Sequence, residues 1–114
     1  MKNALIKKIR ENLTPDLLHP AWRDRADGPL DGHCYVATEC FYYLYGKKNG
    51  WKPMVYRSDN GDTHWWLSKD GERIDITAGQ FKDGYDYSEG HVQAFQSHPS
   101  KRCLKLTDKI SRGM

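Results

Sequence analysis

The chain has 114 residues, of which 38% are hydrophobic and 12% aromatic, and its mean hydropathy is −0.87. This length predicts one domain, residues 1–114, with a small core in which large aromatic rings supply much of the buried area. The net charge is +3 without any basic block. This excess is too weak to indicate nucleic-acid binding, and no apolar stretch is long enough to span a membrane.

The N-terminal residues do not have the pattern of a signal peptide, because Lys7, Lys8 and Arg10 interrupt their apolar run. We therefore expect a cytoplasmic protein, or one of the host cytoplasm if a phage encodes it. Three cysteines cannot all pair with one another, so at least one thiol is free.

The first predicted element is an N-terminal helix, since Leu5, Ile9 and Leu13 recur every four residues. Thr14-Pro15-Asp16 predicts the start of a second short helical turn that ends before Pro20. Residues 19–32 lack periodicity and predict a loop anchored by Trp22.

A central helix is predicted from Cys34 to Gly46, because this stretch contains no glycine or proline before its expected end. Its β-branched and aromatic residues leave a strand as the alternative, although twelve residues are long for one strand of so small a domain.

Three antiparallel strands are predicted next, over residues 54–56, 63–68 and 73–77. Asn60-Gly61 marks the first turn and Asp70-Gly71 the second, a tight hairpin turn. A final amphipathic helix is expected after Pro99, with Cys103, Leu106 and Ile110 on its apolar face. The fold class is therefore α+β, a central helix packed on a small antiparallel sheet.

The hairpin register predicts a contact between an imidazole and a carboxylate. If Asp70 and Gly71 form the turn, Trp66 pairs with Asp75 and His64 with Thr77. His64 and Asp75 are then diagonal neighbours on one face of the sheet, within reach of a hydrogen bond.

Cys34 stands in the first turn of the predicted helix, where backbone N–H groups and the helix dipole favour a thiolate. The same N–H groups suit the oxyanion of a tetrahedral intermediate. Cys34, His64 and Asp75 together have the logic of a thiol acyl-transfer site. The alternative is that Cys34 is a core residue, as free cysteines often are. Cys40 and Cys103 are expected to pack in the core.

The segments Gly32-His33-Cys34, His64-Trp65-Trp66 and Ile74-Asp75-Ile76-Thr77, together with Trp22, Asp70-Gly71 and Gln80-Phe81, resemble the YunG-like family of small bacterial and phage proteins. That family is similar in motif order to papain-like and transglutaminase-like thiol enzymes. The resemblance implies a papain-like or transglutaminase-like fold and a triad of Cys34, His64 and Asp75. The family has glutamine where this chain has His33.

The expected activity is that of a cysteine peptidase, amidase or acyltransferase acting through a thioester on an amide, isopeptide or ester bond. Its substrate would be a protein, a peptide or a small amide or ester, with no cofactor and no metal. Further substrate-binding or supporting residues are expected at four positions: His33, Trp66, Thr77 and Gln80.

Two other functions remain open on the sequence alone. A catalytically dormant form of the same fold would bind a partner or sequester a ligand. A nucleic-acid module would need several scattered basic residues to converge on one face, including Lys7, Arg23 and Arg102.

Overall fold

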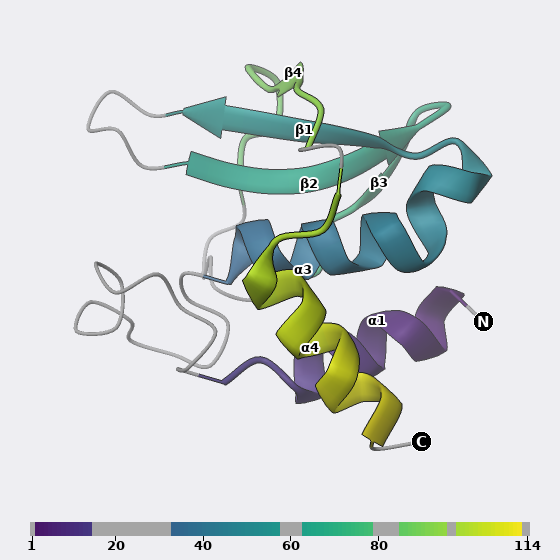
Figure 1. The fold of residues 1–114 in the computed structure, drawn as a ribbon. Helices are drawn as coiled ribbons and strands as arrows, with labels where there is room; N and C mark the ends of the chain where they lie inside the picture. The colour runs from purple at the N-terminus through teal and green to yellow at the C-terminus, as the bar shows by residue number, and fades with distance from the viewer. Residues whose placement is uncertain (1, 15–32, 58–62, 79–84, 96–97, 113–114) are drawn as a thin grey trace.

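The computed structural model describes residues 2–14, 33–57, 63–78, 85–95 and 98–112. These residues form a small α+β fold with three α-helices and a four-stranded antiparallel sheet. Helix α3 lies against one face of the sheet, and α1 and α4 pack on the side of α3 that faces away from it (Figure 1). Within the described ranges, no helix is both long and apolar enough to cross a membrane.

The predicted helices are confirmed at both ends of the chain and at its centre. Helix α1 spans Lys2–Glu11, α3 spans Cys34–Phe41 and α4 spans Lys101–Arg112. The central helix continues as a π-helical turn, Tyr42–Gly46, and a 3-10 turn, Lys47–Asn49, before Gly50 ends it at φ 82°. The strand alternative for this stretch is therefore wrong.

The sheet has the order β3-β2-β1-β4, with β1 at Lys52–Arg57, β2 at Thr63–Lys69, β3 at Glu72–Ile74 and β4 at His91–Val92. The tight turn between β2 and β3 is confirmed, because Asp70 and Gly71 have φ values of 49° and 84°. The predicted register is confirmed as far as the pair Leu67–Ile74. Strand β4 was not predicted.

The third strand is shorter than predicted. It ends at Ile74 rather than Thr77, and the described ladder contains neither the Trp66–Asp75 pair nor the His64–Thr77 pair. The chain turns away at this point, where the N–H of Ala78 donates to the carbonyl oxygen of Asp75 at 3.3 Å. The prediction was wrong because it extended the hairpin rule beyond the turn, whereas helix α3 occupies the edge of β2 that β3 leaves open.

The core lies between the sheet and the helices. Its largest cluster joins Ile9 of α1 and Phe41 of α3 to Leu67 of β2 and Leu106 of α4, each fully buried. This arrangement fixes α3 on the sheet and thereby positions its first residue, Cys34, against β2. The predicted turn at 15–20, the loop at 19–32 with Trp22, and the Asn60-Gly61 turn lie outside the described residues.

Candidate active site

The early end of β3 exposes backbone groups of β2 to side chains of α3. The sulfur of Cys34 donates a hydrogen bond to the carbonyl oxygen of Thr63 at 3.6 Å. One turn later, the hydroxyl of Thr38 donates to the carbonyl oxygen of Trp65 at 3.2 Å. The first turn of α3 is thus attached to the strand backbone on both sides of His64.

The environment of Cys34 keeps its thiol protonated. Burial raises the pKa of Cys34 to about 11, and the charge of Asp75 also raises it. Backbone N–H groups of Trp65, Tyr35 and Cys34 itself act in the opposite direction. The stabilisation of a thiolate that the helix start predicts is therefore present, but the loss of hydration outweighs it because the side chain is only 9% exposed.

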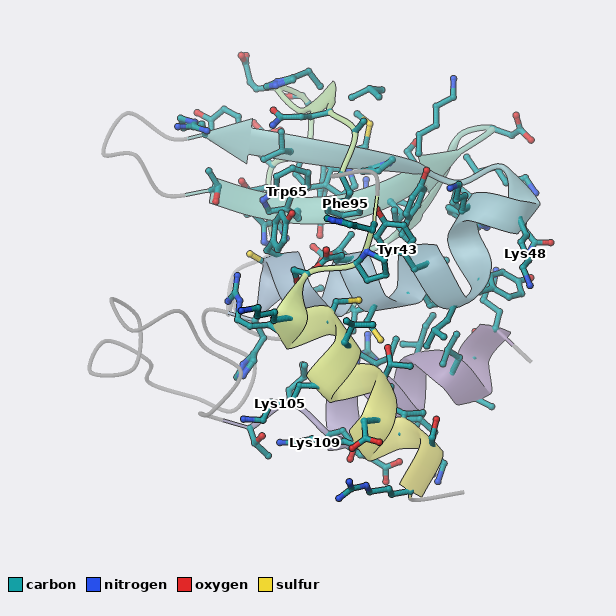
Figure 2. All side chains as sticks on the ribbon, in the orientation of Figure 1. Tyr43, Lys48, Trp65, Phe95, Lys105 and Lys109 are labelled. Atoms are coloured by element: carbon teal, nitrogen blue, oxygen red, sulfur yellow. The ribbon has the colours of Figure 1, made fainter. Side chains whose placement is uncertain are left out.

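The aromatic residues around Cys34 explain this loss of hydration. Trp65 of β2 and Phe95 lie between the sheet and the helices (Figure 2), with their rings stacked at 5.1 Å. Tyr35 of α3 meets the ring of Trp65 edge to face at 5.0 Å. Cys34 belongs to this buried cluster together with Val55 of β1. The thiol therefore lies among apolar side chains on the helix side of the sheet.

His64 and Asp75 form the predicted contact. The imidazole Nε2 lies 2.6 Å from Oδ2 of Asp75, and the two side chains are 5% and 4% exposed. A carboxylate can only accept hydrogen bonds, so Nε2 donates to Asp75, and in the neutral form of the ring the lone pair is on Nδ1. This tautomer makes Nδ1 the basic atom of His64.

The face of the sheet that carries His64 is the one opposite α3. Side chains alternate along a strand, and Trp65 and Leu67 point to the helices. His64 and Trp66 therefore point to the other face, where both are buried, and their rings stack at 5.7 Å, which confirms that Trp66 shares a face with His64. The sulfur of Cys34 contacts the strand backbone on either side of His64, and its hydrogen bond among the described residues goes to Thr63 rather than to the imidazole.

Tyr87 belongs to this site and was not predicted from the sequence. Its hydroxyl donates a hydrogen bond of 2.5 Å to Oδ2 of Asp75, the same oxygen that His64 contacts. Burial and, after it, the hydrogen bond to Asp75 raise the pKa of Tyr87 above its usual range. The segment around Tyr87 has no regular hydrophobic spacing, so the sequence carries no signal that places it beside the hairpin.

The remaining predicted site residues are distributed as follows. His33 is buried, and its Nε2 lies 2.9 Å from the carbonyl oxygen of Thr14, so its ring is directed toward the end of the α1 segment. Thr77 is buried two residues after Asp75, and Gln80 lies outside the described residues. In the described ranges, no three His, Cys, Asp or Glu side chains lie close enough together to hold a metal ion.

Cys40 and Cys103 are packed between α3 and α4, as expected. Both are almost fully buried, and the sulfur of Cys40 lies 3.5 Å from the hydroxyl of Thr107. A hydrogen bond from Cys103 lowers the pKa of Cys40, and the same bond raises that of Cys103. Their position in the helix interface separates them from His64 and Asp75.

No protein-family model, curated protein or solved structure matches this chain. The site itself combines a buried thiol at the start of α3 with an imidazole on β2 that is hydrogen-bonded to the carboxylate of Asp75, the residue after β3.

Proposed function

We propose that the protein is a thiol hydrolase or acyltransferase of the papain-like or transglutaminase-like kind. Cys34 is the nucleophile, His64 the general base and acid, and Asp75 the residue that orients the imidazole. The observation that carries the proposal is the 2.6 Å hydrogen bond between His64 and Asp75, on the strand whose backbone contacts the sulfur of Cys34. The resemblance to the YunG-like family agrees with these roles.

In the resting structure the sulfur of Cys34 and the imidazole of His64 lie on opposite sides of β2. The proposed reaction therefore requires a movement at the start of α3, in which Cys34 exchanges its hydrogen bond with Thr63 for one with Nδ1 of His64. The thiol proton passes to Nδ1 while the sulfur attacks the carbonyl carbon of an amide or ester, forming a C–S bond. His64 then gives this proton to the leaving amine or alcohol as the C–N or C–O bond breaks. Water or an amine attacks the thioester, which restores the thiol and releases an acid or a new amide.

Two features of the site support this sequence of steps. Asp75 stabilises the imidazolium that forms when His64 takes the proton. The backbone N–H groups of Cys34 and Tyr35, which already act on the sulfur, lie at the start of α3, where they suit the oxyanion of the tetrahedral intermediate.

The experiment is acylation by a panel of p-nitrophenyl esters, followed by intact mass and peptide mapping. We expect a mass increase equal to one acyl group, located on Cys34, together with release of p-nitrophenolate. Cys34→Ala abolishes the adduct. Cys103→Ala removes a buried thiol outside the site and leaves the adduct in place.

The role of the imidazole is tested in the same assay. His64→Gln keeps a polar side chain beside Asp75 but has no basic nitrogen, so we expect acylation to slow by a factor of 100 or more, since general-base catalysis contributes about 10² to 10⁴. His91→Gln is the matched control, because His91 is exposed on β4. An adduct that persists in Cys34→Ala, or equal rates for His64→Gln and wild type, contradicts the proposal.

The second candidate is a binding protein with a dormant site. The burial of Cys34 and its pKa of about 11 favour this function, because the resting thiol is a poor nucleophile at neutral pH. It predicts that no ester of the panel acylates Cys34 and that Cys34→Ala retains the biological effect of the protein.

A further inference from the structure

Asp75 is a buried carboxylate with two hydrogen-bond donors on one oxygen. Oδ2 accepts from Nε2 of His64 at 2.6 Å and from the hydroxyl of Tyr87 at 2.5 Å. Oδ1 is buried and accepts no hydrogen bond from the described residues. An ionised carboxylate that is 4% exposed requires such donors, because it has lost most of its hydration.

The ring of Tyr87 is held by contacts that do not involve its hydroxyl. The guanidinium of Arg73 lies 3.7 Å from the ring centroid, and the indole of Trp66 meets the ring edge to face at 5.0 Å. The N–H of Gly90 donates to the carbonyl oxygen of Tyr87 at 3.2 Å and closes a turn beside Trp66. The packing therefore directs the hydroxyl at Asp75, and phenylalanine fits the same place.

We infer that Tyr87 is a positioning residue, which acts through Asp75 to set the proton affinity of His64. The inference rests on the proposed function of the His64–Asp75 pair. Tyr87 is a neutral donor, so it stabilises the carboxylate whether the imidazole is neutral or protonated. Without it, the imidazole is the one remaining donor to Oδ2 of Asp75 among the described residues, and this favours the imidazolium form.

The consequence for catalysis follows from the role of His64 as a base. A base must be neutral before it accepts the thiol proton. A residue that weakens the attraction of Asp75 for the imidazolium therefore leaves more His64 in the competent form at a given pH. Tyr87 therefore extends the reactive pH range of the site downward.

The test is an NMR titration of the carbon-bound imidazole protons of His64 in the full chain carrying Cys34→Ala. We expect Tyr87→Phe to raise the midpoint of this titration by about 0.5 to 1 pH unit. This shift corresponds to part of the free energy of one charge-assisted hydrogen bond to Asp75, whose Oδ2 is shared by two donors. In an Asp75→Asn background, Tyr87→Phe has no further effect, because the charge through which Tyr87 acts is absent.

Tyr56→Phe is the matched control, since Tyr56 packs on the same aromatic group through Tyr85, at 6.5 Å between ring centroids, and keeps its ring in the variant. Its titration midpoint stays at the parental value. An unchanged or lowered midpoint for Tyr87→Phe, or the same rise for Tyr56→Phe, overturns the inference. Every sample carries Cys34→Ala, so the result does not depend on whether Cys34 can be acylated.

Discussion

The sulfur of Cys34 donates a hydrogen bond to the carbonyl oxygen of Thr63, the residue that precedes His64 in β2. This bond attaches the start of α3 to the strand edge that β3 leaves open when it ends at Ile74. The proposed nucleophile and the proposed base are therefore connected through one strand. In the resting state, the hydrogen bond of the thiol within the described part of the chain goes to this backbone carbonyl.

The raised pKa of Cys34 predicts a specific loss of stability in alkaline solution. The pKa rises from 9.0 to about 11 because the folded protein buries the thiol. The unfolded chain therefore loses this proton first as the pH rises. The neutral thiol contributes fully to stability below pH 9, and its contribution disappears as the pH passes through 9 to about 11.

We expect the free energy of unfolding of wild type to fall by about 2 to 3 kcal/mol more than that of Cys34→Ala across this interval. Urea unfolding followed by tryptophan fluorescence measures both proteins at each pH. The comparison removes the contributions of Tyr35 and Tyr87, whose pKa values burial also raises and which both proteins share. Parallel pH curves for the two proteins would show that the thiol is not desolvated.

Gly90 is required by its contact with Trp66. A Cβ atom at residue 90 would lie 2.2 Å from Cζ2 and 2.4 Å from Cη2 of the indole, so Gly90→Ala forces the turn and the ring apart. We expect this variant to lower the free energy of unfolding by about 1 to 3 kcal/mol. Because the same turn carries Tyr87, the imidazole signals of His64 should also shift in NMR spectra.

The relief of this clash can be measured directly. Trp66→Phe removes the part of the ring that meets residue 90. We therefore expect Gly90→Ala to lower the free energy of unfolding less in the Trp66→Phe background than in wild type, as measured by urea unfolding of the two pairs of proteins. Equal costs in both backgrounds would mean that the contact does not determine the identity of residue 90.

Gly71 is required for a different reason, the conformation of its backbone. Its φ is 84°, and a Cβ at this position would meet no atom within 4 Å. Gly71→Ala should therefore lower the free energy of unfolding by about 1 kcal/mol through backbone strain alone. Gly71→Asn is the control, because asparagine tolerates this region, and urea unfolding should place it between wild type and Gly71→Ala.

The sequence was sufficient to predict features that depend on local rules. The Asp70-Gly71 turn was predictable because both residue types accept a positive φ. This turn fixes the register of β2 and β3. The pairs Trp66–Asp75 and His64–Thr77, from which the contact of His64 with Asp75 was predicted, are absent from the described ladder, but the hydrogen bond itself is present. The start of the central helix at Cys34 was also correct.

Features that depend on contacts between distant segments were not predictable in this way. Tyr87 reaches Asp75 through an irregular segment whose path depends on Gly90 and Trp66, and no periodicity encodes that path. The desolvation of Cys34 comes from Trp65 and Phe95, which stand 31 and 61 residues later in the chain. A helix start favours a thiolate locally, but burial by tertiary packing determines that the pKa of Cys34 shifts upward.

The last prediction concerns Glu39, a fully buried carboxylate that joins α3 to α4. It accepts hydrogen bonds from the backbone N–H of Ser100 at 2.9 Å and from the hydroxyl of Ser100 at 2.6 Å. Ser100 in turn accepts from the N–H of Cys103, so it caps the start of α4. Glu39→Ala leaves the two partly buried donors of Ser100 without their acceptor and should lower the free energy of unfolding by about 3 kcal/mol.

A double-mutant cycle with Ser100→Ala in urea unfolding separates this hydrogen bond from the loss of packing. We expect a coupling of about 1 to 3 kcal/mol between the two substitutions, because each removes the other's contact. Glu11→Ala, on the exposed surface of α1, is the control and should change stability by less than about 0.5 kcal/mol. Additive effects of Glu39→Ala and Ser100→Ala would mean that packing alone, and not the carboxylate, positions α4 on the helix that carries Cys34.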